Sequence, residues 1–286
     1  MAGTVPFRRA AVIGTGLIGG SFALALHKHF PGIIVVGHSR AGSLERALER
    51  GVIQEAVSDL ALAVRGADLV YISLPIGATI DALGAIAAAA EPHALVTDAG
   101  STKAAICKAA AAHFRSGARF LGAHPMAGKE KAGVDYADAE LFRGASYALV
   151  ANEEDPDPRV KAFTEIVRAI GAQPVWTDAD THDWAVGIVS HLPQLVSIAL
   201  AQVVRDETDE TGMPLTLAGP GLQDMLRLAG SPYNIWRDIL LTNTDNASRA
   251  LDRLAQAVDH LRRNLASKEL EQEFNAANGV YKLLRK

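Results

Sequence analysis

The feature that most constrains the fold of this chain is a glycine-rich turn near its start. Residues 14–21 read GTGLIGGS, which contains the spacing G-x-G-x-x-G. The apolar run 10–13 precedes the turn, an Ala- and Leu-rich helical pattern follows it to about His29, and a second apolar run covers 33–37. A strand, a glycine turn, a helix and a second strand in this order predict a dinucleotide-binding unit.

Each glycine of the motif has a physical role in such a unit. Gly14 permits the tight turn, Gly16 lets a pyrophosphate approach the backbone, and Gly19 lets the helix pack on the strand. The free N–H groups at the helix start, near Leu17 and Ile18, and the helix dipole favour phosphate binding. The alternative is a glycine turn that binds no ligand.

The end of the second strand bears on the choice between NAD and NADP. NAD sites usually place an acid here to accept a hydrogen bond from the ribose, but residues 36–40 read VGHSR. Ser39 and Arg40 can bind a 2′-phosphate, which an acid would repel. The sequence therefore predicts NADP as the preferred cofactor. If Arg40 only covers the adenine or faces solvent, NAD is the alternative.

Strand and helix patterns continue to alternate up to about residue 176. Further strands are expected at 69–74, 94–98, 118–121 and 173–176, and helices at 43–50, 78–90 and 159–170. This alternation predicts a doubly wound, Rossmann-type α/β domain over 1–176, with helices on both faces of a parallel sheet. Because such domains bind ligands at the carboxyl ends of their strands, Ser73 and Pro75 are expected at the cofactor.

The stretch 122–133, GAHPMAGKEKAG, is where we expect the chemistry to occur. Its glycines and Pro125 argue against a core strand. His124 is therefore expected just past the strand 118–121, in a loop at the ligand-binding edge of the sheet. The alternative for His124 is a solvated side chain in an ordinary loop.

Other polar side chains lie near the same expected edge. Asp98 and Ser101 follow a strand and are expected to cap a helix that starts near Thr102, which is compatible with a role in a site. Lys129 and Lys131 either attract an anionic substrate or are only solvated.

The second half of the chain, 177–286, predicts an all-helical domain. The run 181–204 is long and apolar, and Pro193 should kink it. His191 and Gln194 lie three residues apart and therefore share a helix face. A polar pair in so apolar a run is costly unless it has an internal partner or binds a ligand.

Apolar residues then recur at three- and four-residue spacing. They are Ala247, Ala250, Leu251, Leu254, Ala257, Val258, Leu261 and Leu265. This pattern predicts an amphipathic helix with a narrow apolar seam. We expect the seam to pack across a homodimer; packing onto the chain's own domain is the alternative.

Charge and composition narrow the possible binding partners and the possible location of the protein. The net charge of −4 gives no electrostatic case for binding nucleic acid or an anionic membrane. No uninterrupted apolar run reaches the roughly 18 residues that span a bilayer, and no signal peptide is recognisable. The single Cys107 excludes an internal disulfide and a multi-cysteine metal site. We therefore expect a cytoplasmic protein that binds a small molecule and no metal.

Four motifs occur together in the order and spacing of one enzyme family. They are GTGLIGGS at 14–21, DAGSTKA at 98–104, GAHPMAGKEKAG at 122–133 and SHLPQ at 190–194. With DMLRLAGSPYNIWRDI at 224–239, the chain resembles the prephenate dehydrogenases over nearly its whole length. That family includes the arogenate and cyclohexadienyl dehydrogenases of tyrosine biosynthesis. The pair HPMAG and SHLP is the most specific part of the resemblance.

The resemblance implies oxidative decarboxylation of prephenate to 4-hydroxyphenylpyruvate, with NADP or NAD as hydride acceptor. It implies that His124 accepts the proton of the C4 hydroxyl, with a pKa near its ordinary value. By the same resemblance Ser101 hydrogen-bonds the hydroxyl and orients the histidine, and Arg227 binds a substrate carboxylate.

The resemblance also assigns the substrate pocket. His191 and Trp236 match family residues in or near it. Gln194 stands where many prephenate-using members have a second His, close to the side chain that distinguishes prephenate from arogenate. We favour prephenate, with an arogenate or dual-substrate cyclohexadienyl dehydrogenase as the alternative. No fused chorismate mutase or regulatory domain is expected.

Two other function classes fit the predicted architecture. A 3-hydroxyacid or 6-phosphogluconate-type dehydrogenase normally carries a catalytic Lys in its helical half, but no Lys occurs between Lys161 and Lys268. A non-catalytic nucleotide-binding protein would not need Ser101, His124 and Arg227 together.

Overall fold

One eight-stranded sheet forms the centre of the first half of the chain, in a computed structural model that describes residues 6–129 and 131–285. The strands are β1 (Arg9–Ile13), β2 (Ile34–His38), β3 (Glu55–Ala56), β4 (Leu69–Ile72), β5 (Leu95–Asp98), β6 (Arg119–Pro125), β7 (Ser146–Val150) and β8 (Gln173–Thr177). Their order is β3-β2-β1-β4-β5-β6-β7-β8, so the strand order reverses between β1 and β4. A doubly wound sheet opens its ligand crevice at that reversal.

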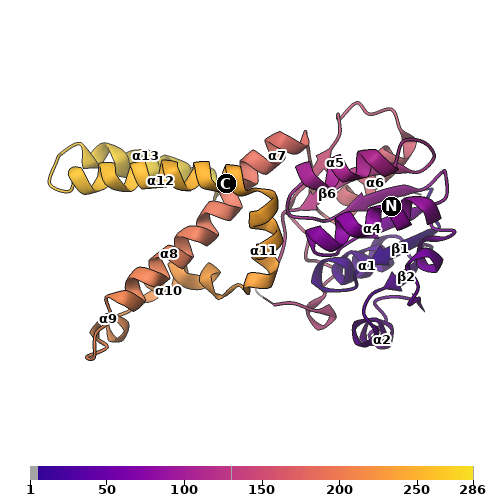
Figure 1. Cartoon of the computed structure of the whole chain (residues 1–286), viewed down its shortest axis with the longest axis horizontal. Coiled ribbons are helices and arrows are strands. Elements are labelled where there is room, and N and C mark those ends of the chain that lie inside the picture. Colours follow the sequence, from indigo (N-terminus) through magenta and orange to yellow (C-terminus); the bar gives the residue numbers. More distant parts are fainter. Residues whose placement is uncertain (1–5, 130, 286) are drawn as a thin grey trace.

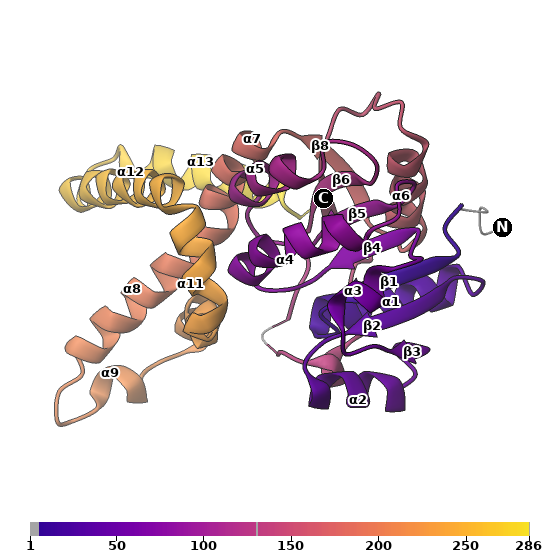
Figure 2. The same cartoon turned by 45° about the vertical axis from the view of Figure 1, so that its right-hand side comes forward.

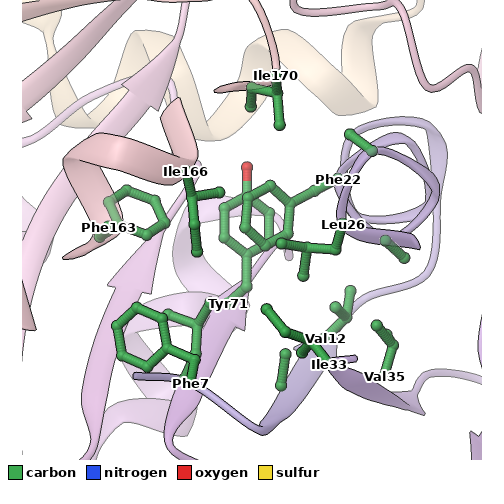
Figure 3. Packing of buried hydrophobic residues seen from close by; sticks show 14 of the residues in the cluster. Phe7, Val12, Phe22, Leu26, Ile33, Val35, Tyr71, Phe163, Ile166 and Ile170 are labelled. Atoms are coloured by element: carbon green, nitrogen blue, oxygen red, sulfur yellow. The ribbon is translucent and has the colours of Figure 1, made fainter. Parts of the chain in front are cut away.

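Helices cover both faces of the sheet (Figures 1 and 2). They are α1 (Leu17–His29), α2 (Ala41–Glu49), α3 (Leu60–Val64), α4 (Ile76–Ala89), α5 (Ala104–His113) and α6 (Pro158–Ala169), with a 3-10 turn η1 (Val134–Tyr136). Successive residues of one strand serve opposite faces: Tyr71 belongs to one buried cluster and Ile72 to the other. On the first face, Phe22 of α1 stacks on Tyr71 with ring centroids 3.8 Å apart (Figure 3). The predicted α/β fold class is confirmed.

β6 continues further than the sequence pattern predicts. His124 and Pro125 are part of the strand, opposite Ala148 and Tyr147 of β7. This pairing is antiparallel, whereas the other pairings of the sheet are parallel. The prediction that His124 lies in a loop past the strand is therefore wrong. Pro125 is tolerated because it is the last residue of the strand, where a missing donor interrupts no further ladder.

The rest of the chain is helical over the described residues. The elements are α7 (Ala179–Val186), a π-helical turn η2 (Gly187–His191), α8 (Leu192–Asp206), α9 (Met213–Thr216), α10 (Pro220–Leu226), a 3-10 turn η3 (Arg227–Gly230), α11 (Tyr233–Thr242), α12 (Thr244–Arg263) and α13 (Leu270–Leu283). Figure 1 shows two arms that point away from the sheet, one made of α8 to α10 and the other of α12 and α13.

α7, η2 and α8 form one continuous helical segment, 179–206, which by length and composition could cross a membrane. The π-helical turn lies immediately before Pro193, which has no N–H to donate and whose ring crowds the preceding turn. The polar residues His182, Asp183 and His191 of this segment are buried inside the protein. The segment therefore resembles a core helix of a folded domain on one side, with an apolar surface left on the other.

Candidate functional site

His124 lies at the carboxyl end of β6, where it is joined to two residues of α7. Its Nδ1 is 2.9 Å from Nε2 of His182, and the two rings meet edge to face with centroids 5.1 Å apart. The other ring nitrogen of His182, Nδ1, lies 2.8 Å from Oδ1 of Asp183. All three side chains are buried. A hydrogen-bonded chain of His124, His182 and Asp183 thus connects the sheet to the helical domain.

Asp183 also closes the start of α5. Its Oδ1 accepts the N–H of Lys103 at 2.6 Å, and its Oδ2 accepts the N–H of Ala104 at 2.9 Å. Burial raises the pKa of Asp183, but the hydrogen bond to His182 and these two N–H groups outweigh burial and hold the pKa below its ordinary value. The carboxylate is therefore charged and fixed at a helix N-terminus, where the helix dipole favours it.

A buried ion pair lies beside the same strand end. Nζ of Lys103 donates to Oδ2 of Asp98 and, at 2.8 Å, to the carbonyl oxygen of Ala123. Oδ1 of Asp98 accepts the N–H of Ala123 at 3.1 Å, and its Oδ2 accepts the N–H of Gly100 at 2.8 Å. The ion pair thus clamps the residue that precedes His124. Asp98 therefore binds Lys103 and the N–H groups of Gly100 and Ala123. The prediction that Asp98 caps α5 is wrong, because Asp183 of the helical domain supplies the cap.

The surroundings of His124 keep its ring neutral. Burial lowers the pKa of His124 well below its ordinary value, and the neighbouring His182, Lys103 and His191 lower it further. The expectation of an ordinary pKa is therefore wrong. Among the described residues, the ring of His124 makes its hydrogen bond through Nδ1, which leaves Nε2 for a ligand. A neutral imidazole with one uncommitted nitrogen can accept a proton.

His191 lies beside this network, at the end of η2. Nδ2 of Asn243 donates to Nδ1 of His191 at 3.1 Å and to the carbonyl oxygen of Asp183 at 2.7 Å. The ring of His191 meets Trp236 edge to face at 5.9 Å, and Trp236 Nε1 donates to Oγ of Ser231 at 3.0 Å. Burial lowers the pKa of His191 to about 4, so this ring is also neutral at neutral pH.

Gln194 and Ser197 are both buried on α8 and, three residues apart, share one face of the helix. Nε2 of Gln194 has no hydrogen-bond partner among the described residues. Oγ of Ser197 accepts the N–H of Ala229 at 3.0 Å, so η3, which begins with Arg227, packs against α8 at this position. Arg227 itself is exposed, in contrast to the buried network around His124.

The glycine turn has the shape that a dinucleotide requires. Gly14 has a φ of +96°, and a Cβ there would lie 2.2 Å from the carbonyl oxygen of Ser73. A Cβ on Gly19 would lie 1.9 Å from the carbonyl oxygen of Gly14, so the start of α1 could not approach β1 with any side chain at either position. Space outside Gly16 is open, as close approach of a phosphate group demands.

A cavity of about 410 Å³ opens beside this turn, at the carboxyl ends of β1, β4 and β5. Its walls include six of the predicted residues, Gly16, Leu17, Ile18, Ser73, Pro75 and Ser101. Lys129 and Lys131 line the same cavity from the loop after β6. Free N–H groups at the start of α1 suit the phosphates of a nucleotide. Lys131 adds a positive charge, whereas Lys129 is paired with Asp138 at 3.0 Å.

Ser39 and Arg40 follow β2 next to the glycine turn. The N–H of Gly14 donates to the carbonyl oxygen of His38 at 2.7 Å, which ties the turn to the end of β2. Ser39 is partly buried, and Arg40 is exposed at the N-terminus of α2. Both residues are therefore placed where the adenosine side of a bound dinucleotide reaches this fold.

The sequence reasoning missed the residues that the helical domain contributes to the network. His182, Asp183 and Asn243 have no motif of their own, although two adjacent polar residues at the start of an apolar helical run were a usable signal. Asp238 was missed too: its Oδ2 accepts the N–H of Gly77 at 3.0 Å, at the start of α4. The helical domain thus places a carboxylate on each of two helices of the α/β domain.

Comparisons with known proteins agree over most of the chain. Residues 22–176 match the family model "Prephenate dehydrogenase, nucleotide-binding domain", and residues 178–277 match "Prephenate dehydrogenase, dimerization domain". A prephenate dehydrogenase of Bacillus subtilis (strain 168) is 31% identical over 263 residues, which cover 91% of this chain and 71% of the relative.

Two solved structures share the fold closely. Prephenate dehydrogenase from A. aeolicus, in complex with hydroxyphenyl propionate and NAD+, superposes with a TM-score of 0.87 at 26% identity and covers 99% of both chains. Synechocystis arogenate dehydrogenase superposes with a TM-score of 0.82 at 29% identity, over 96% of this chain and 99% of that chain. With a nucleotide-binding turn after β1, a buried histidine at the end of β6 and both domain models matched, the chain belongs to the prephenate dehydrogenase family of NAD(P)-dependent oxidoreductases.

Proposed function

We propose that this protein is a prephenate dehydrogenase, which converts prephenate and NADP to 4-hydroxyphenylpyruvate, CO2 and NADPH. Family membership supports the reaction class. The observation that carries the assignment is His124, a buried and neutral imidazole at the end of β6 whose Nδ1 is already engaged by His182. Such a histidine is equipped to accept one proton through Nε2.

The residues of this chain divide the work of the reaction. The C4–H bond breaks with both of its electrons, and the bound nicotinamide supplies the acceptor for this hydride. His124 takes the proton of the C4 hydroxyl, and Ser101, which lines the cavity, hydrogen-bonds that hydroxyl. The bond to the ring carboxylate breaks, its electrons enter the ring, CO2 leaves, and the proton held by His124 returns to the phenolate oxygen.

Gln194 supports prephenate over arogenate. Its Nε2 is a buried donor without a partner among the described residues, and an unmatched buried donor is costly. The keto oxygen of prephenate's pyruvyl group would accept from it, whereas the ammonium group that arogenate carries in its place would not; the side-chain carboxylate is common to both substrates. Arg227 is proposed to bind a substrate carboxylate from η3, as the family resemblance implies. Arogenate is the second candidate, because one of the similar solved structures is an arogenate dehydrogenase.

We propose NADP as the preferred cofactor, because Ser39 and Arg40 follow β2 where an NAD site would carry an acid. A cation here pairs with a 2′-phosphate but gains little from a ribose hydroxyl. Lys129 and Lys131, which line the cavity beside the glycine turn, add positive charge, although Lys129 is paired with Asp138 at 3.0 Å. The A. aeolicus relative was solved with NAD+, so the two cofactors must be compared directly.

We also propose a homodimer formed through the helical domain. The seam residues Leu251, Val258 and Leu261 of α12 are partly or largely exposed in the single chain, and so is Phe274 of α13. A second copy would cover them, together with the apolar side of 179–206. A helix that packs in a dimer in this way is compatible with a cytoplasmic enzyme.

Reduction of NADP on addition of prephenate, followed by absorbance of the reduced nicotinamide, tests the assignment. We expect turnover with prephenate to exceed turnover with arogenate. His124→Ala should lower kcat by roughly 10²- to 10⁴-fold, the usual contribution of a general base, while NADP still binds. The exposed His93 provides a matched control, and His93→Ala should leave kcat unchanged. No reduction with either substrate, or normal turnover in His124→Ala, would refute the proposal.

A further inference from the structure

α7 contributes two buried ionisable side chains that the proposed reaction does not itself use. His182 and Asp183 lie at the junction of the two domains, and each is almost fully removed from solvent. Burying a carboxylate and an imidazole is costly unless their polar atoms are matched. Asp183 accepts three hydrogen bonds, from His182 and from the N–H groups of Lys103 and Ala104.

Asp183, at one end of the hydrogen-bonded chain, fixes the direction of these hydrogen bonds. The carboxylate of Asp183 only accepts, so Nδ1 of His182 must carry a proton and donate. A neutral His182 then has a bare Nε2, which can only accept. Nδ1 of His124, 2.9 Å away, must therefore carry the proton of that hydrogen bond. Neutral His124 is left with an unprotonated Nε2.

We propose that Asp183 and His182 are positioning residues that hold His124 in the tautomer with a bare Nε2. This proposal rests on the proposed role of His124 as the proton acceptor. The opposite tautomer would present an N–H to the substrate hydroxyl and could not take its proton. In other enzymes a carboxylate orients a histidine general base by a direct hydrogen bond. Here a second histidine, His182, stands between the carboxylate of Asp183 and His124.

The hydrogen-bonded chain also supplies a negative charge for protonated His124, a state that burial and the other neighbouring groups disfavour. Lys103, which is paired with Asp98, faces His124 as a positive charge, and His182 and His191 are the other ionisable groups that lower its pKa. Asp183 is therefore the negative charge near the ring that no Lys or Arg side chain neutralises among the described contacts. When His124 gains a proton, His182 transmits the attraction of this carboxylate to it.

Because Asp183 caps α5, the tautomer of His124 depends on how the two domains are docked. The cap bonds to Lys103 and Ala104 set the position of Asp183, and the ion pair of Lys103 and Asp98 sets the position of β6. Asp183 and His124, the two ends of the hydrogen-bonded chain, are thus both held in place by the segment 98–104. The helical domain therefore sets the tautomer of His124 through His182 and Asp183, in addition to covering it.

Histidine ¹⁵N NMR on the full-length protein tests the tautomer without any turnover. We expect His124 to be protonated at Nδ1 and bare at Nε2 in the wild type, and to lose this preference in His182→Leu. A His124 protonated at Nε2 in the wild type would overturn the proposal, whether or not the protein oxidises prephenate. Absence of turnover in a protein with the expected tautomer would instead refute the proposed function alone.

Kinetics of three variants separate positioning from mere packing. His182→Leu removes the acceptor and should lower kcat about 10- to 100-fold, the loss seen when histidine-orienting partners are removed at metal sites, with the KM for NADP unchanged. His182→Gln keeps a carbonyl oxygen near the position of Nε2 and should restore most of kcat. Equal losses in both variants would contradict the proposal.

Asp183→Asn gives a third readout, the pH profile. Removing the negative charge lowers the pKa of His124 further, so the rising limb of kcat against pH should move to lower pH while the plateau falls. A purely structural role for Asp183 would lower the melting temperature and leave the limb in place. If His182→Leu does not fold, His182→Gln, Asp183→Asn and the wild-type NMR still decide the question.

Discussion

The α/β half and the helical half bury their apolar side chains to very different extents. Phe22 and Tyr71 of the α/β half are fully buried, whereas Phe274 of α13 is 71% exposed and Leu261 of α12 is 40% exposed. None of the described residues of α13 is buried. The first half therefore completes its core within one chain, and the second half presents a surface that a partner has to cover.

The two halves meet through polar contacts and through one small apolar cluster, in which Ile76 and Ile106 of the α/β half pack with Ile239 of α11. Asp183 caps α5, Asp238 binds the N–H of Gly77 at the start of α4, and the hydroxyls of Thr102 and Thr242 lie 2.7 Å apart. Contacts of this kind specify an orientation but add little hydrophobic stability. The difference between the halves teaches that stability, assembly and site geometry are carried by separate parts of this molecule.

The largest effect is expected in the α/β core. Phe22→Ala removes a ring that stacks on Tyr71 at 3.8 Å, and it should lower the free energy of unfolding by about 3–5 kcal/mol. Urea unfolding followed by circular dichroism measures this loss. Phe274→Ala, at an exposed position, should change the unfolding of the α/β half little. Equal losses in both variants would break the comparison.

A smaller effect is expected at the helical seam. Leu261→Asp places a charge on the exposed apolar face of α12 and should weaken a dimer by about 2–4 kcal/mol, because a central apolar contact is replaced by a buried charge. Analytical ultracentrifugation should then show monomer at concentrations where the wild type is dimeric. Leu62→Asp, at an exposed position on α3, is the matched control. A wild type that stays monomeric would mean that the helical half needs no partner.

The smallest change in free energy is expected for cofactor binding to the α/β half, which completes its core within one chain. Arg40→Ala should weaken NADP binding about 10- to 100-fold, because one charge-assisted contact to the 2′-phosphate contributes roughly 1.5–3 kcal/mol. NAD binding and the oligomeric state should not change. Titration calorimetry with both cofactors measures this, with Arg65→Ala as the control. NADP and NAD weakened equally would show that Arg40 does not read the phosphate.

Local patterns predicted most of the α/β half. β1, α1 and β2 lie within one or two residues of their expected bounds, because a glycine turn between apolar segments leaves few alternatives. β7 was not predicted, although its pairing extends β6 through His124. Antiparallel pairing to a neighbour distant in sequence has no local signal, and Pro125 argued in the opposite direction.

The candidate site also has a part that the sequence predicted and a part that it did not. Gly16, Ser73 and Ser101 line one cavity as predicted, because the carboxyl ends of parallel strands meet at one edge of a sheet. The environment of His124 was not predictable: burial and neighbouring charges lower its pKa, and neither is visible in the motif. Arg227, predicted in the substrate pocket, lies exposed on η3 beside α8.

The sequence by itself determined the family and the dinucleotide-binding turn and singled out His124 as the expected proton acceptor, because each depends on short-range spacing that survives in the chain without its fold. Only the tertiary structure decided how that histidine is held. His124 and His182 are 58 residues apart in the sequence and come from different domains, yet they share one hydrogen bond. A contact of that range exists only after the two domains have docked, which is why no pattern along the chain could specify it.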